Sequence, residues 1–110
     1  MTTTTINGEF EIRMARRADA PALHEMILAL AAFEKLTAIC VATAADIEDA
    51  LFGPKPGAEA LIASNNGRPA GFALFSQNFS TFLGRRGLWL EDLFVRDEYR
   101  RRGCATALLR

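Results

Sequence analysis

The stretch that decides the fold runs from Gly87 to Val95 and reads Gly-Leu-Trp-Leu-Glu-Asp-Leu-Phe-Val. It predicts a buried strand that is interrupted by a pair of carboxylates, Glu91 and Asp92. A short basic turn, Arg100-Arg-Arg-Gly103, follows and leads directly into a helical start at residues 104–110. The N–H groups of such a turn and of a first helical turn are unpaired and point to one place. The arrangement therefore predicts a seat for an anion such as a pyrophosphate.

The pattern Arg100-x-x-Gly103-x-Ala105 resembles the acetyl-CoA signature of the GNAT superfamily of N-acetyltransferases. The longer run 90–95, followed by Glu98-Tyr-Arg100, is similar to the branch that acetylates diamines (spermidine and spermine) and thialysine. The resemblance implies an α/β fold with a mixed, mostly antiparallel sheet and helices on both faces. It also implies transfer of an acetyl group from the cosubstrate acetyl-CoA to a primary amine of a small polyamine-like or thialysine-like molecule.

Composition indicates a single globular domain of 110 residues with ordinary apolar content. Thirteen basic residues are balanced by thirteen acidic ones, so we expect neither nucleic acid nor an anionic membrane as a partner. No apolar run approaches the roughly 20 residues of a membrane span, and no signal peptide is recognisable. Cys40 and Cys104 have no metal-type spacing, which favours free thiols in the cytoplasm and predicts no metal.

We expect residues 1–8 to be a frayed N-terminus and residues 9–110 to form the domain. GNAT domains are longer than this chain, and Arg110 falls within the helix that follows the phosphate-binding turn. We therefore expect a C-terminal truncation. The tyrosine that serves relatives as general acid lies in their C-terminal region, and Tyr99, the only tyrosine here, does not match that role.

The remaining elements are predicted from periodicity and turn chemistry. Residues 9–14 alternate as a half-buried strand, and residues 22–36 form an amphipathic helix with Asp19 as its N-cap. A capping box at Thr43 begins a short helix over 44–52. Strands over 58–64 and 69–77 are joined by a hairpin turn at Asn65-Asn-Gly67, and residues 78–86 form a loop.

The resemblance assigns ten residues to the coenzyme. The backbone at the end of the decisive strand would pair with the pantetheine arm like an added strand, and the basic turn would hold the pyrophosphate. These residues are Leu93, Phe94, Val95, Arg100, Arg101, Arg102, Gly103, Cys104, Ala105 and Thr106. Arg101 stands where relatives usually carry glycine, and Cys104 is interpreted as a packing residue rather than a nucleophile.

The acceptor amine is an ammonium in water, with a pKa of about 10, so a proton must be removed. Glu91 is the candidate base: burial on an apolar strand would favour its taking up a proton, and neighbouring Asp92 would disfavour two negative charges. By resemblance, Glu91 acts through an ordered water, while Asp92 and Glu34 hold the substrate. Phe82 either belongs to the core or lines the acceptor tunnel.

Each of these features also has a purely structural interpretation. A Glu-Asp pair often faces water at a sheet edge, three arginines are often a solvated charge run, and Glu34 can belong to a solvated helix face. The alternative function is a non-catalytic, incomplete GNAT domain that binds coenzyme A or a partner protein. A nucleic-acid binder is disfavoured by the zero net charge. A homodimer is expected by analogy with relatives.

Overall fold

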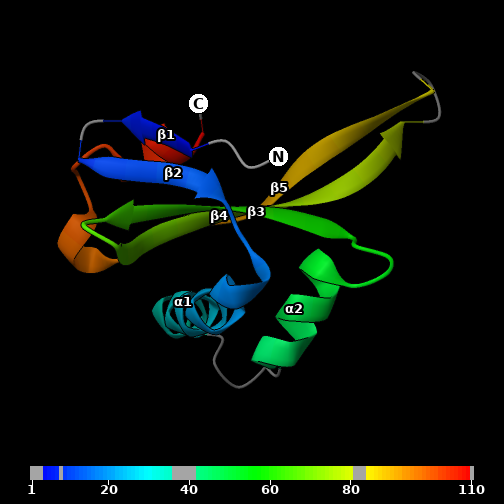
Figure 1. Cartoon of the computed structure of the whole chain (residues 1–110), viewed down its shortest axis with the longest axis horizontal. Coiled ribbons are helices and arrows are strands. Elements are labelled where there is room, and N and C mark those ends of the chain that lie inside the picture. Colours follow the sequence, from blue (N-terminus) through cyan, green and yellow to red (C-terminus); the bar gives the residue numbers. More distant parts are fainter. Residues whose placement is uncertain (1–3, 8, 36–41, 81–83, 110) are drawn as a thin grey trace.

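A computed structural model describes residues 4–7, 9–35, 42–80 and 84–109 of the chain. The described part forms a five-stranded sheet in the order β1-β2-β3-β4-β5, and each neighbouring pair is antiparallel (Figure 1). The strands are β1 (Thr4–Asn7), β2 (Phe10–Met14), β3 (Ala58–Asn65), β4 (Arg68–Ser80) and β5 (Arg85–Val95).

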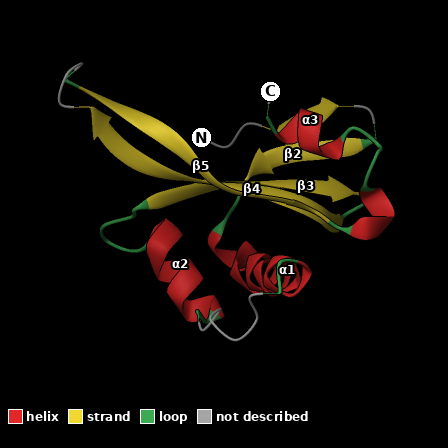
Figure 2. Ribbon diagram, turned by 180° about the vertical axis from the view of Figure 1, so that it is seen from behind, coloured by secondary structure: helices red, strands yellow, loops and turns green. Residues whose placement is uncertain are grey.

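Helices cover both faces of this sheet (Figure 2). On one face lie α1 (Ala20–Phe33) and α2 (Ala44–Phe52), and on the other lies α3 (Cys104–Leu108). Two short 3-10 turns, η1 (Arg17–Asp19) and η3 (Asp97–Tyr99), precede α1 and the basic turn. The predicted fold class is therefore confirmed. None of the described helices is long and apolar enough to cross a membrane.

Alternation along the strands divides the buried residues into two clusters, one on each face of the sheet. Phe72 and Phe94 face α1 and pack with Leu23 and Met26. Their strand neighbours face α3 instead, and the second cluster contains Phe10, Ile12, Ala63, Ala70, Ala73, Val95, Tyr99, Cys104, Ala107 and Leu108. Strand β4 is thus paired on both sides and covered on both faces.

Several local predictions are confirmed. The capping box of α2 is present: Thr43 Oγ1 accepts from the N–H of Asp46 at 3.1 Å, and Asp46 Oδ2 accepts from the N–H of Thr43 at 2.8 Å. Strand β3 ends at Asn65, and the turn to β4 uses positive φ at Asn66 and Gly67. Helix α1 begins slightly earlier than predicted and ends at Phe33, with Glu34 at its C-cap.

Two predictions about extended segments were wrong. Residues 4–7 do not fray but form β1, paired with β2 from Thr4↔Arg13 to Asn7↔Phe10. Residues 78–80 and 85–86 are not loop but continue the β4–β5 hairpin, which extends beyond the other strands (Figure 1). In both places the backbone hydrogen bonds are satisfied by pairing with another strand, so local composition gave little sign of it. Phe82 lies outside the described residues.

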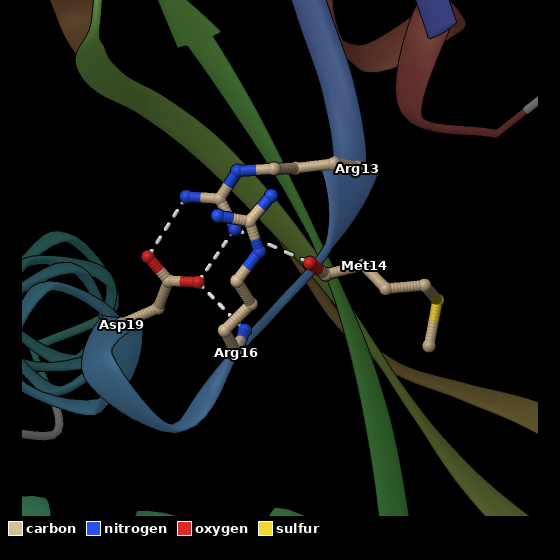
Figure 3. Close-up of polar contacts among 4 residues, drawn as sticks. All are labelled: Arg13, Met14, Arg16 and Asp19. Carbon is tan, nitrogen blue, oxygen red and sulfur yellow. Dashed lines mark hydrogen bonds and ion pairs between the residues drawn. The ribbon is translucent and has the colours of Figure 1, made fainter. Parts of the chain in front are cut away.

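A part-buried ion pair joins the end of β2 to the start of α1 (Figure 3). The guanidinium of Arg13 donates to both carboxylate oxygens of Asp19, at 2.6 and 2.9 Å, and the N–H of Arg16 donates to the same carboxylate at 2.6 Å. Asp19 is the N-cap residue of α1, as predicted, but its carboxylate makes no capping bond to that helix and instead accepts from the N–H of Arg16 at the start of η1. The hydrogen bond from Arg13 is the main cause that lowers the pKa of Asp19.

We expect Asp19→Asn to lower the free energy of unfolding by about 2 kcal/mol at pH 7, because it removes a charge-assisted pair and leaves Arg13 without its counter-charge. Since the folded pKa of Asp19 is depressed, this contribution is complete above the ordinary carboxyl pKa and is lost as the pH falls through the folded value. Urea unfolding at pH 7 and at about pH 3 checks both points. Glu59→Gln, at an exposed position on β3, is the control and should change stability little.

Candidate functional site

Strand β5 carries a β-bulge at the carboxylate pair. Asp92 pairs with Leu74, but the next pair along β4 is Phe75 with Leu90, so Glu91 has no partner. Bulges often re-aim a side chain beside a functional site. Here Glu91 is exposed, and its carboxylate accepts a hydrogen bond from Ser76 Oγ at 2.7 Å. The expectation that Glu91 is buried was therefore wrong, because the extra residue turns it out of the ladder.

The more enclosed carboxylate is Asp92, which is half-buried on the face of the sheet that α1 covers. Burial raises the pKa of Asp92, and the negative charges of Glu91 and Glu34 raise it further. Glu34 comes from the C-cap of α1, so residues far apart in the sequence meet here. The structure thus brings together the three acidic residues that the sequence assigned to catalysis and substrate binding.

A cavity of about 500 Å³ lies next to these carboxylates, between β5, the basic turn and α1. Nine of the ten residues assigned to the coenzyme line it: Leu93, Phe94, Val95, Arg100, Arg101, Gly103, Cys104, Ala105 and Thr106. Sequence reasoning missed Leu30, Phe33 and Tyr99, which also line it. Leu30 and Phe33 belong to the predicted amphipathic helix over 22–36, and helical spacing alone gives no sign that they also line a cavity.

The basic turn has an unusual backbone. Arg101 has φ 63° and Gly103 has φ 85°, both in the left-handed region. Arg101 therefore adopts, at the position where relatives usually carry glycine, a conformation that costs an ordinary residue about 1 kcal/mol. Within the described chain, the N–H groups of Arg101, Arg102 and Gly103 donate to no other backbone group. The turn consequently presents several backbone donors beside the cavity.

Two of the three arginines of the turn have their side chains engaged within the protein. Arg102 does not line the cavity; it forms a two-point ion pair with Glu9, at 2.5 and 2.8 Å, and lies over the ring of Tyr99. Arg100 donates from Nε to the carbonyl of Val95 at 2.9 Å. The prediction of three cations around the anion seat was therefore too simple, and the geometry does not support a ligand role for the Arg102 side chain.

The thiol of Cys104 is almost fully buried, and this burial raises its pKa to about 11. It is therefore neutral at physiological pH, which agrees with packing rather than nucleophilic chemistry. Tyr99 is also buried and packs edge-on against Phe10, with the ring centroids 6.1 Å apart.

The fold is shared with solved acetyltransferases. The structure of a possible acetyltransferase from Clostridium difficile 630 superposes with a TM-score of 0.76 at 18% identity, covering 91% of this chain and 66% of that one. The profile of the acetyltransferase (GNAT) family matches residues 25–110. The chain belongs to the GNAT family of acetyltransferases.

Among curated proteins, the chain is similar to a thialysine N-epsilon-acetyltransferase from Caenorhabditis elegans, with 35% identity over 90% of this chain and 60% of that protein. It is also similar to an L-ornithine N5-acetyltransferase from Arabidopsis thaliana, with 27% identity over 89% of this chain and 63% of that protein. The chain thus spans less than two thirds of the length of either relative.

We expect Gly103→Ala to lower the free energy of unfolding by about 1 kcal/mol, because a side chain is strained at this positive φ. A Cβ at Gly103 would meet no other atom within 4 Å, so the loss measures backbone strain without a clash. Gly57→Ala is the matched control: it also meets nothing within 4 Å, and its φ is not positive. Urea unfolding of the two variants compares them. Equal stability of both would contradict the assignment of strain to the turn.

Proposed function

We propose that this chain is part of an N-acetyltransferase that transfers the acetyl group of acetyl-CoA to a primary amine of a small, polyamine-like or thialysine-like molecule. The observation that carries the proposal is that β5 contributes residues both to the lining of the cavity and to the cluster of carboxylates. Residues Leu93–Val95 line the cavity beside the basic turn, and Glu91 and Asp92 immediately precede them on the same strand. One strand therefore joins a coenzyme-sized cavity to a cluster of carboxylates.

The residues that line the cavity suit the chemistry of the coenzyme. Its wall is apolar along Leu30 and Leu93, which fits a pantetheine arm, and its other end is formed by Arg101 and Gly103 of the basic turn. Backbone N–H groups of that turn would hold the pyrophosphate, with the guanidinium of Arg101 adding positive charge. When bound, acetyl-CoA supplies an acetyl thioester to be attacked by the amine.

The carboxylates suit an acceptor that carries two amino groups. Glu91, presented to solvent by the bulge and oriented by Ser76, would take the proton of the reacting ammonium through a water. Glu34 and Asp92 would attract the distal ammonium. A backbone N–H near the bulge would stabilise the developing oxyanion, a contribution that is typically about 3–4 kcal/mol.

The names of two curated relatives support the choice of acceptor, since one acts on thialysine and the other on ornithine. Both names describe amines that carry a second charged group. A homodimer and a cytoplasmic location belong to the same proposal and rest on analogy with the family.

We expect calorimetric titration of the 110-residue chain to show saturable one-to-one binding of acetyl-CoA, with free CoA binding at the same site. Binding followed by acetylation of a diamine supports the enzyme. Binding without turnover of any diamine, thialysine or ornithine favours the alternative, a domain that holds coenzyme A without catalysis. The absence of binding of both ligands would contradict a working coenzyme site in this chain.

We expect Glu91→Gln to reduce kcat by about 100-fold across pH 7–9, because the amide cannot accept the proton that the ammonium must lose. The KM for acetyl-CoA should change little, since Glu91 does not line the cavity. Steady-state kinetics with a diamine measures both constants. Glu59→Gln is the control, as an exposed glutamate on β3. Equal kcat in wild type and Glu91→Gln would remove Glu91 from the role of base.

A further inference from the structure

The side chain of Arg100 bridges the end of β5 and the end of α1. Its Nε donates to the carbonyl of Val95 at 2.9 Å, and its Nη1 lies 2.7 Å from Oδ1 of Asp97. The guanidinium carbon lies 4.7 Å from the ring centre of Phe33 and 6.0 Å from that of Phe94. Arg100 is therefore anchored on the strand side by polar contacts and meets the helix side through an aromatic face.

Phe33 has an unusual environment for a large apolar side chain. It is the last residue of α1, and its exposed fraction is 66%. It is not part of either buried cluster, and the guanidinium of Arg100 lies over its ring. The stack continues inward through Phe94 to Phe72. The ring centroids of Phe94 and Phe72 are 6.1 Å apart. The row of groups thus connects the core to the exposed end of the helix.

The same stack separates two cavities. The cavity of about 500 Å³ assigned to the coenzyme and a second cavity of about 460 Å³ share three lining residues, which are Phe33, Phe94 and Arg100. A change in the Arg100 side chain would therefore open one cavity into the other and leave the end of α1 without this contact.

Glu34 depends on the position of this helix end. It directly follows Phe33, its N–H donates to the carbonyl of Leu30 at 3.0 Å, and the chain turns away at Lys35 with φ 60°. Glu34 therefore moves with the last turn of α1. That turn lies against β5, which carries Asp92, through Leu30, which packs on the cluster containing Phe94, and through the stack of Phe33 on Arg100.

We infer that Arg100 is a positioning residue for the acceptor side of the site: its side chain fixes Phe33, and through it places Glu34 opposite Asp92. This role differs from that of a phosphate ligand, which the signature pattern alone suggested. The interpretation of Glu34 and Asp92 as an amine site rests on the proposed function, whereas the contacts of Arg100 with Phe33, Phe94 and Val95 do not.

The first test is a carbon-detected NMR titration of the Asp92 carboxyl group, which requires no turnover. The charge of Glu34 contributes to the raised pKa of Asp92. If Arg100 positions Glu34, Arg100→Ala and Phe33→Leu will both lower the pKa of Asp92. The decrease in Glu34→Gln, which removes the charge of Glu34 altogether, is the largest decrease that either variant should reach. Loss of the positive charge of Arg100 by itself would raise the pKa of a carboxyl group. A lost charge and a displaced Glu34 therefore predict pKa shifts of opposite sign.

Matched variants distinguish an effect of the stack on the pKa of Asp92 from an effect of the positive charge. Arg101→Ala removes a cation from the same turn without touching the stack, and it should not lower the pKa of Asp92. Arg100→Lys keeps the charge but lacks the planar guanidinium, so it should lower that pKa in part. Should Arg100→Ala fail to fold, as judged by thermal unfolding, Phe33→Leu and Arg100→Lys carry the test. An unchanged or raised Asp92 pKa in these variants overturns the inference.

Kinetics and calorimetry give the second test. A positioning role predicts that Arg100→Ala raises the KM for a diamine by roughly tenfold, a larger factor than any loss of CoA affinity, because Arg100 also lines the coenzyme cavity. Weakened CoA binding with an unchanged diamine KM would assign Arg100 to the phosphate and overturn the inference. If the wild-type chain acetylates no amine, the proposed function fails, while the NMR result still decides the role of Arg100.

Discussion

Strand β5 can approach β4 only because Gly71 has no side chain. Gly71 pairs with Val95, and a Cβ at that position would come within 2.5 Å of the carbonyl oxygen of Phe94 and within 3.2 Å of Cα of Val95. The close approach buries Phe94 toward α1 and Val95 toward α3. Because η3, the basic turn and α3 follow Val95 along the chain, the position of the cavity and of these elements depends on this one contact between backbones.

The bulge gives the two ends of β5 different roles. From Leu93 to Val95 the strand keeps its register with β4 and belongs to the packed body of the molecule. Beyond Glu91 the register shifts by one residue, and a shift of one reverses the faces that side chains occupy. The carboxylates therefore lie at the junction between the packed strand and the hairpin arm, close to the end of α1. An acidic pair in a regular ladder would instead have pointed to opposite faces of the sheet.

The sequence was most informative where the deciding signals are local. The capping box at Thr43, the Asn-Gly turn and the apolar run of β4 each depend on neighbours within a few positions, and the signature located nine residues of the cavity. It was least informative where partners are distant. Arg102 binds Glu9, 93 positions away, and β1 exists because β2 offers an edge. The exposure of Glu91 follows from a register shift that no local pattern encodes.

The arginines of the basic turn show why charge counts predict anion sites poorly. Arg102 is neutralised by Glu9, and Arg100 contacts Asp97, the carbonyl of Val95 and two aromatic rings. These contacts shape the turn and orient its N–H groups, with Arg101 held at positive φ between them. A ligand that binds such a turn depends on the direction of backbone dipoles more than on the number of cations. The affinity of such a ligand should therefore fall less with rising salt concentration than it would at a turn with three free arginines, because few mobile counterions are displaced.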